Sequence, residues 1–380
     1  MDITKAGRDI GPDILRALAI LLVTGTHMPG DNLPPAFTTY WGQFGWLGVD
    51  VFFVLSGYLI GTELLKPVHR GAAPNLVVFY IKRFFRILPA YWLILAIYVL
   101  IPTWREGPTM APAWKFLTFT MSFGLDIRTE RAFSHAWSLC AEEHFYLILP
   151  ALVLLLRKLG RPWLPIALGL ALIAGGMVLR HTLWIDWKTH TQGETALFMK
   201  AIYYPSYTRF DGLIMGVGLA ALRLWYPQAW ARFARPVFTL SLAALCLGTT
   251  LYTNFVHGFV LTELGSVIFY PLFALGVALL LAAILELEPY LQPLRRTGFG
   301  FIAAISYSLY LSQKLVFHAT QTFLPASWLH GWGAIVIYYV TAIAVAAVMY
   351  WAVERTSLIL RNRVLARLSG HPTAPVAEMA

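Results

Sequence analysis

Long apolar runs separated by short polar segments recur along the whole chain. An α-helix needs about 20 apolar residues to cross a bilayer, so each run is a candidate transmembrane helix. The pattern predicts an all-α fold, a polytopic integral membrane bundle of about ten transmembrane helices. The expected spans are 13–29, 45–65, 87–102, 137–156, 163–180, 208–225, 236–255, 264–287, 300–323 and 333–353.

The composition excludes both a water-soluble globule and a disordered chain. Hydrophobic residues make up 58% of the 380 positions and charged residues only 13%, far from the soluble average. A formal net charge of +10 on so apolar a chain favours anionic lipid, so we expect a bilayer and no nucleic acid as partner. Cys140 and Cys246 both lie in apolar runs, where we interpret them as packing residues.

The Lys and Arg residues between the spans predict the orientation. With a cytoplasmic N-terminus, 20 of the 29 fall in inner segments, eight fall in outer segments, and Lys314 lies within a span. This distribution agrees with the positive-inside rule. We therefore expect both termini in the cytoplasm and the connections 103–136 and 181–207 outside. An eleventh span at 114–124 would place the later basic loops outside and is rejected.

The chain is expected to divide into a transmembrane domain, 1–356, and a cytoplasmic C-terminal tail, 357–380. The end of this tail, 369–380, is small and contains Pro, which is typical of disorder. The two outer connections carry four tryptophans that suit a membrane interface or a sugar face, namely Trp104, Trp114, Trp184 and Trp187.

Ionisable residues within spans are costly and often functional. Arg16 and His27 are 11 positions apart in the first span, which places them near one helix face and about 16.5 Å apart along the axis. A single His on a helix is often structural, and it is also a candidate general base. The face that it shares with Arg16 keeps both interpretations open.

The second span begins with Asp50 at its outer end, where the carboxylate could contact His27. Gly57 and Gly61 form a small-xxx-small pair, which favours close helix packing. Ser56 lacks the flanking glycines of a nucleophile elbow, so a nucleophilic serine is not expected.

A basic cluster of Lys82, Arg83 and Arg86 precedes the third span. Positive-inside orientation by itself accounts for such a cluster. Phosphate recognition is the other interpretation, because Arg83 and Arg86 lie three positions apart on one helix face and guanidinium groups fit phosphate oxygens. Arg16 lies on the same side of the membrane.

The fourth span opens with an unusual density of polar residues. His135, Ser138 and Glu142 share one helix face, whereas Glu143 and His144 point elsewhere. This density favours function over packing. Glu143-His144 does not supply the His-Glu-x-x-His motif of zinc proteases, and no metal site is expected.

Arg209 and Asp211 open the sixth span, as either a buried structural pair or part of the same site. The outer ends of four spans then carry one acid-base set, and the inner ends carry the basic residues. Two substrates that approach from opposite faces would suit this arrangement. The outer set is His27, Asp50, Glu142, Arg209 and Asp211.

At these positions the sequence resembles the bacterial acyltransferase-3 family, membrane acyltransferases that O-acylate envelope and secreted glycans. The resemblance covers nearly the whole chain, with several motifs in the same order. The motifs are Leu15-Arg16-Ala17 with His27, Gly48 to Ile60, Arg83 with Arg86-Ile87-Leu88-Pro89, Trp137-Ser138-Leu139 before Glu142, Arg209-Phe210-Asp211 with Gly216, and Ile305 to Leu311.

The resemblance implies an acyl-CoA donor, usually acetyl-CoA, that enters from the cytoplasm of a bacterial cell. The acyl group is then transferred at the inner or plasma membrane to a hydroxyl of a carbohydrate or related acceptor. His27 matches the family's essential histidine and Arg16 its partner arginine. Arg83 and Arg86 match the family's basic motif.

The sequence departs from the family pattern in two places. Many members read Tyr-Leu-Trp-His where this chain has Tyr310-Leu311-Ser312-Gln313, and Glu-Arg-Pro where it has Glu354-Arg355-Thr356. The first departure bears on acceptor or acyl specificity. Lys314 follows it within a span, where we expect it to pair with a carboxylate or a donor phosphate. Many members also carry a fused outer domain that this sequence lacks, so we expect another protein to perform any accessory transfer step.

We therefore expect an acyl-CoA-dependent membrane O-acyltransferase in which His27 is the general base and Glu142 or Asp50 holds its tautomer. An acyl-histidine intermediate is the competing route. The expected site residues are His27, Glu142 and Asp50 for catalysis, Arg16, Lys82, Arg83 and Arg86 for the donor, and Ser138, Arg209, Asp211 and Gln313 for the substrate.

A membrane transporter or flippase for a glycan or an acidic solute is the alternative. Ten helices with buried ionisable residues also describe many carriers. Inverted repeats would favour this class, and the halves 1–156 and 163–353 show no convincing match.

Overall fold

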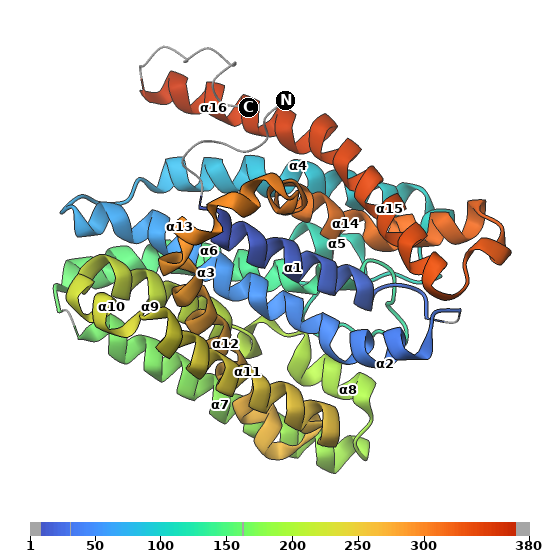
Figure 1. Ribbon diagram of the computed structural model, residues 1–380, viewed down its shortest axis with the longest axis horizontal. Coiled ribbons are helices and arrows are strands. Elements are labelled where there is room, and N and C mark those ends of the chain that lie inside the picture. The colour runs from blue at the N-terminus through green and yellow to red at the C-terminus, as the bar shows by residue number, and fades with distance from the viewer. Residues whose placement is uncertain (1–8, 31, 162, 370–380) are drawn as a thin grey trace. The chain divides into compact units, whose positions relative to one another are not determined.

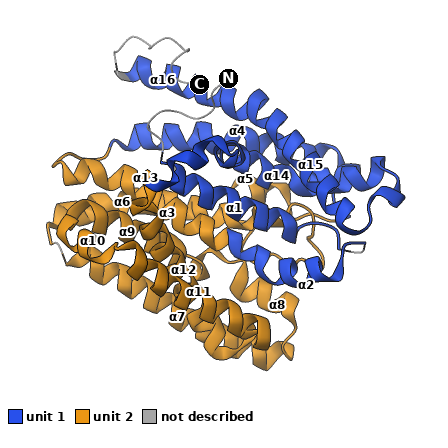
Figure 2. Ribbon diagram, in the orientation of Figure 1, with its two compact units in different colours: residues 1–48, 75–108, 290–380 blue, residues 49–74, 109–289 orange. Residues whose placement is uncertain are grey.

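The computed structural model describes residues 9–30, 32–161 and 163–369. Within these residues the regular structure is helical, apart from one isolated bridge between Met110 and Ala132. The expected all-α class is confirmed. The chain forms two compact units (Figure 2), the first made of 1–48, 75–108 and 290–380 and the second of 49–74 and 109–289.

The first unit collects three separate stretches of chain. Its α14 packs against both α1 and α15, and its α4 packs against α16. The helices of this unit, labelled in Figure 1, are α1 (Ile10–Thr26), α2 (Pro35–Phe44), α4 (Leu76–Leu100), α14 (Phe299–Phe323), α15 (Gly331–Met349) and α16 (Arg355–Ser369).

In the first unit, polar side chains of one helix donate hydrogen bonds to backbone carbonyls of another helix. The Tyr339 hydroxyl on α15 donates to the Leu21 carbonyl of α1 at 2.8 Å, and the Tyr307 hydroxyl on α14 donates to the Ile87 carbonyl of α4 at 3.0 Å. Between α15 and α16 the helix widens into a π-helical segment, Tyr350–Glu354. Such widened turns re-aim the side chains that they carry.

The second unit is built around α12, which packs against α7, α9 and α11. Its helices are α3 (Gly48–His69), α5 (Ala113–Leu117), α6 (Trp137–Leu159), α7 (Leu164–Thr191), α8 (Thr195–Phe198), α9 (Asp211–Trp225), α10 (Pro227–Phe233), α11 (Pro236–His257) and α12 (Glu263–Glu286). A short helix, α13 (Glu288–Leu291), lies at the chain boundary between the two units.

The small residues of the second span pack as expected. A methyl group on Gly57 of α3 would overlap the Leu213 carbonyl of α9, and one on Gly216 would overlap the Val54 carbonyl. Gly61 lies against Val217 of the same helix. The interpretation of Gly57 and Gly61 as a close-packing pair is confirmed, because only glycine lets the two backbones approach so closely.

Seven helical stretches among the described residues are long and apolar enough to cross a membrane. They are Pro35–His69, Leu76–Leu100, Ser134–Leu159, Leu164–Thr191, Pro236–His257, Glu263–Glu286 and Gly331–Leu368. The three other expected spans correspond to α1, α9 and α14, which are helical but short or polar. The count of ten spans and the cytoplasmic termini stay predictions.

One expected boundary is wrong. The segment 181–191 belongs to α7, which ends only where Gln192 and Gly193 adopt positive φ angles of 54° and 85°. Helix α16 continues to Ser369, so the expected tail 357–380 begins with helix, and the division at 356 stays a prediction. The expected disorder of 370–380 lies outside the described residues, as do Lys5 and Arg8 of the orientation argument.

Candidate active site

His27 caps the C-terminal end of α1 and is partly exposed. The last turn of this helix is held by α2, because the Trp41 indole donates to the Leu22 carbonyl at 3.1 Å. A methyl group on Gly25 would overlap the Trp41 ring, so glycine allows this approach. Tertiary contacts therefore fix the end of α1 from which His27 projects.

The His27 ring contacts the middle of α14. The Gln313 amide nitrogen lies 3.1 Å from Nδ1 of His27, and the Gln313 side chain is completely buried. The ring also has a hydrogen bond with the backbone of Val23, one turn earlier in α1. Gln313 therefore touches the candidate base directly, and its expected contact with the substrate stays a prediction.

Lys314 follows Gln313 on α14 and forms an ion pair with Glu106 at 3.7 Å. The Tyr98 hydroxyl donates to the other oxygen of Glu106 at 2.7 Å. Lys314 also lies within electrostatic range of His27. The expectation that Lys314 pairs with a carboxylate is confirmed, but Glu106 was not expected, because it follows α4 in a polar connection whose sequence has no distinctive pattern.

Arg16 and Arg86, two of the expected donor-binding residues, each pair with a buried carboxylate of the same unit. Arg16 lies 3.3 Å from Asp13, one turn earlier in α1. Arg86 on α4 lies 2.8 Å from Glu354, whose side chain is almost fully buried and also accepts a hydrogen bond from Ser308. No role was expected for Glu354, which appeared in the sequence only as part of the segment Glu354-Arg355-Thr356 that departs from the family pattern.

Lys82 and Arg83 complete the basic cluster on α4. Both are partly exposed, and the Arg83 guanidinium lies 5.8 Å from the centre of the Phe79 ring. The cluster thus combines an arginine that neutralises Glu354 with two cations at the polar end of a long apolar helix.

In the second unit, Asp50 forms a buried ion pair with Arg209 at 2.7 Å. Four aromatic rings surround the Arg209 guanidinium, and the nearest are Tyr270 and Tyr203, with ring centres 4.2 and 4.4 Å away. Trp137 and Phe53 complete the set at 5.1 and 6.0 Å. Cation–π contacts and the ion pair together compensate the charge that burial removes from water.

Asp211 pairs with Arg180 of α7, also at 2.7 Å, and both side chains are buried. Arg180 further donates to the backbone carbonyls of Thr208 and Val267. Arg209 and Asp211 are thus both buried ionic residues, but each has a partner other than its neighbour in sequence. Arg180 is the last residue of the expected span 163–180, and it is buried because α7 continues beyond it to Thr191.

Glu142 on α6 accepts a hydrogen bond at 2.9 Å from the Tyr146 hydroxyl, one turn later, which also contacts Ser56. Ser138, on the same helix, is buried. Nδ1 of His144 lies 2.9 Å from the Ser206 hydroxyl, on a different face from Glu142, as the helical spacing predicts. His27 belongs to the first unit and Asp50 and Glu142 to the second, so their expected contact stays a prediction.

The segments between the membrane helices carry an ionic cluster. Arg128 donates to both carboxylate oxygens of Asp126, at 2.9 and 2.7 Å, and to Glu194. These hydrogen bonds hold the pKa of Asp126 well below its usual range. Lys200 lies 3.4 Å from the same carboxylate.

Two of the four tryptophans expected at an interface have other partners. Trp187 is buried against Phe198 and Ile202 and donates to the Glu194 carbonyl, and Trp184 donates to the Leu261 carbonyl. A sugar-facing role is therefore wrong for Trp187, because its ring is packed inside the protein. Trp104 and Trp114 are exposed.

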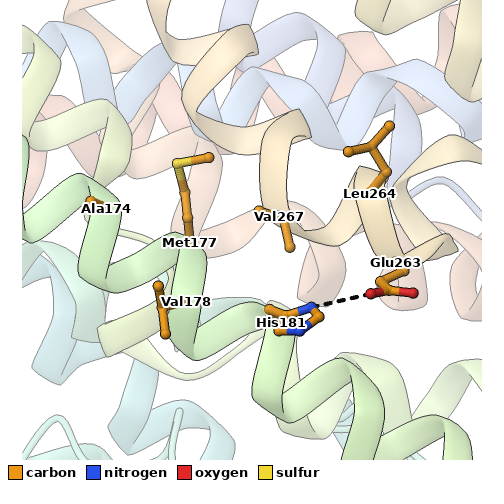
Figure 3. A pocket seen from close by; sticks show the side chains of 7 residues that line it. All are labelled: Ala174, Met177, Val178, His181, Glu263, Leu264 and Val267. Atoms are coloured by element: carbon orange, nitrogen blue, oxygen red, sulfur yellow. Dashed lines mark ion pairs between the residues drawn. The ribbon is translucent and has the colours of Figure 1, made fainter.

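A groove of about 580 Å³ lies between α7 and α12 (Figure 3). Its lining is mostly apolar, and its polar contact is the exposed pair of His181 and Glu263 at 3.3 Å. None of the expected site residues lines this groove. Among the described residues, no three His, Cys, Asp or Glu side chains gather to hold a metal ion.

The sequence profile of the acyltransferase-3 family, an acyltransferase domain, matches residues 9–351. The chain belongs to this family. The match contains both the His27 site and the buried ionic pairs of the second unit. Gln313, which departs from the family pattern, is also a residue that contacts His27.

Two relatives similar to this chain are O-acetyltransferases by name, and one of them is a peptidoglycan O-acetyltransferase. The peptidoglycan O-acetyltransferase OatA of Listeria monocytogenes is 28% identical over 363 residues, which cover 87% of this chain and 53% of the relative. The O-acetyltransferase OatA of Staphylococcus aureus is 28% identical over 234 residues, covering 58% of this chain and 35% of the relative. This chain thus spans about half the length of the Listeria relative and about a third of the length of the Staphylococcus relative. No solved structure matches.

Proposed function

We propose that this protein is a membrane O-acetyltransferase that moves an acetyl group from cytoplasmic acetyl-CoA to a hydroxyl of a cell-envelope glycan, with peptidoglycan as the acceptor class. Membership of the acyltransferase-3 family and the names of the relatives support the reaction type. The positive-inside distribution supports a cytoplasmic donor and an acceptor on the outer side.

The observation that carries the proposal is the position of His27. The residue that matches the family's histidine stands at the end of a helix, partly exposed, with its ring held by a buried amide. A general base needs such an ordered and accessible ring. His27 takes the proton of the acceptor hydroxyl while the hydroxyl oxygen bonds to the acyl carbon, and the thioester C–S bond breaks.

The donor is held at the opposite end of α1. Arg16 lies in the first half of this helix, about 16.5 Å from His27 by helix rise, and the basic cluster on α4 belongs to the same unit. We assign the phosphate contacts to Arg16 and to the cluster of Lys82, Arg83 and Arg86, of which Arg86 also pairs with Glu354. A long thioester carrier suits a donor site and a base at opposite helix ends.

The test is acetyl transfer by the purified full-length protein in liposomes, with labelled acetyl-CoA as donor and peptidoglycan fragments as acceptor. Mass spectrometry of the fragments identifies the product. His27→Ala should abolish transfer and leave acetyl-CoA affinity nearly unchanged. His257→Ala, an exposed histidine at the end of α11, is the matched control and should retain transfer.

Near-normal transfer by His27→Ala would remove His27 from the chemistry. Incubation with labelled acetyl-CoA in the absence of acceptor separates the two routes, because only an acyl-histidine leaves label on the protein. If the wild-type protein acetylates no envelope fragment, the proposed function is wrong. Movement of an unmodified glycan across the liposome membrane would instead support the transporter alternative.

A further inference from the structure

Gln313 presents a buried amide of which only one end has a partner. Its nitrogen faces Nδ1 of His27 at 3.1 Å, whereas its oxygen, Oε1, is buried with no hydrogen-bond partner in the described part of the chain. A buried carbonyl oxygen without a donor is unfavourable, because it has lost its water. A hydrogen bond to Oε1 that forms during the reaction would offset this desolvation cost.

The surroundings fix the backbone of Gln313. Gln313 lies in the middle of α14, the helix that packs against both α1 and α15. The neighbouring Ser312 hydroxyl bonds back to the Ser308 carbonyl at 2.8 Å, and Ser308 donates to the buried Glu354. With the helix held in this way, the amide keeps its distance to the ring, and its nitrogen and oxygen ends are so similar in size that either one can face Nδ1.

The two ends of an amide match the two protonation patterns of Nδ1. When Nδ1 carries the lone pair, the amide N–H donates to it and the ring proton lies on Nε2. When Nδ1 carries a proton, a half-turn of the amide brings Oε1 to accept it, and Nε2 has the lone pair. The second arrangement satisfies the oxygen that is otherwise unpartnered.

We propose that Gln313 is the positioning residue of His27, and that its oxygen accepts the Nδ1 proton so that Nε2 acts as the base. This inference rests on the proposed function. Nε2 takes the hydroxyl proton as the acceptor oxygen bonds to the acyl carbon, and the departing CoA thiolate takes that proton back. Throughout, Nδ1 keeps its proton, which it shares between Gln313 and the Val23 carbonyl one turn earlier, so that Nε2 stays free.

Lys314, the next residue on α14, lies within electrostatic range of His27 and is paired with Glu106. A carboxylate at position 313 would add an anion against Nδ1. Because a neighbouring anion favours the charged imidazolium, Gln313→Glu should move the acid limb of the pH–activity profile to higher pH. If His27 were not the base, this limb would stay where it is.

The experiment compares variants of the full-length protein in liposomes, with acetyl-CoA and peptidoglycan fragments as substrates. Gln313→Leu should lower kcat roughly tenfold or more with KM for acetyl-CoA unchanged, because the ring loses its orientation. Gln313→His restores a hydrogen-bonding partner and should recover part of kcat. Gln321→Leu, at an exposed glutamine of the same helix, should match the wild-type protein.

A readout independent of turnover is the ¹⁵N NMR spectrum of histidine-labelled protein, with the His27 signals assigned by their loss in His27→Gln. Gln313→Leu should change the His27 tautomer signals and leave the other histidines unchanged. Unchanged His27 signals, or unchanged kcat together with an unchanged pH profile in Gln313→Glu, would overturn the proposal. Absence of transfer by the wild-type protein would refute the proposed function, while the NMR comparison still decides whether Gln313 sets the tautomer.

Discussion

The Arg86 guanidinium lies 2.8 Å from the carboxylate of Glu354, 268 residues later in the chain. Glu354 is almost fully buried in the π-helical turn between α15 and α16, and Arg86 is partly exposed on α4. Ser308 of α14 donates to the same carboxylate. This pair therefore connects three parts of the first unit and gives Arg86 a structural role beside its expected contact with the donor.

Removal of Arg86 should destabilise the protein. Arg86→Ala leaves the buried carboxylate of Glu354 without its cation, so we expect the free energy of unfolding to fall by about 1.5–3 kcal/mol, the range for a hydrogen bond to a charged group. Denaturant unfolding of the purified protein measures this. Arg363→Ala, at an exposed arginine on α16, is the control, and equal stability of the two variants would show that the pair contributes little.

Arg83 should matter for the donor more than for stability. Arg83→Ala is expected to weaken acetyl-CoA binding by about 1.5–3 kcal/mol, since a charge-assisted contact with a phosphate is lost. Isothermal titration calorimetry with acetyl-CoA provides the measurement, and the Arg363→Ala variant is again the control. Wild-type affinity in Arg83→Ala would exclude this residue from the donor site.

Lys314 and Glu106 should behave as a coupled pair. Both are largely buried, so Lys314→Met and Glu106→Gln each leave a charge without its partner and should each destabilise the protein. The double variant should be more stable than additivity predicts by about 0.5–3 kcal/mol. Additive effects would mean that the two charges do not interact. Unchanged turnover and expression in Lys314→Met would mean that the protein tolerates Lys314 without needing it.

The orientation of α7 can be tested by chemical labelling. Thr189→Cys, at an exposed position near Lys188, should react with an impermeant maleimide in intact cells, because the end of α7 is expected outside. Lys158→Cys, at the exposed end of α6, should react only after lysis. Both variants need a Cys246→Ser background, since this free cysteine is partly accessible. The reverse pattern would contradict the orientation.

The ion pair of Asp126 predicts a dependence of stability on acid pH. Hydrogen bonds from Arg128 lower the pKa of Asp126 in the folded state, so the carboxylate stabilises the protein above the unfolded-state pKa of about 3.9, and this contribution is lost as pH falls towards the folded-state pKa. Asp126→Asn should therefore be less stable than the wild-type protein at pH 7, and the difference should narrow below about pH 4. A pH-independent difference in unfolding midpoints would contradict this assignment.

The sequence predicted the helical class and most of the apolar spans, because these depend on local properties of the chain. Helical spacing places Glu142 and His144 on different faces of α6, and Gly57 could be identified as a packing position before any partner was known. The end of α7 was not predicted, because the polar residues from Arg180 onward end the apolar run but not the helix, which continues until Gln192 and Gly193 adopt positive φ.

What the sequence by itself determined is which residues are ionisable within apolar helices and therefore need partners. Only the tertiary structure decided what those partners are. Gln313 faces His27 because α14 packs against α1, and Asp211 pairs with Arg180 because α7 and α9 are neighbours. The physical reason is that burial makes pairing obligatory for each charge or amide, whereas the choice of partner depends on which helices pack together, often hundreds of residues apart.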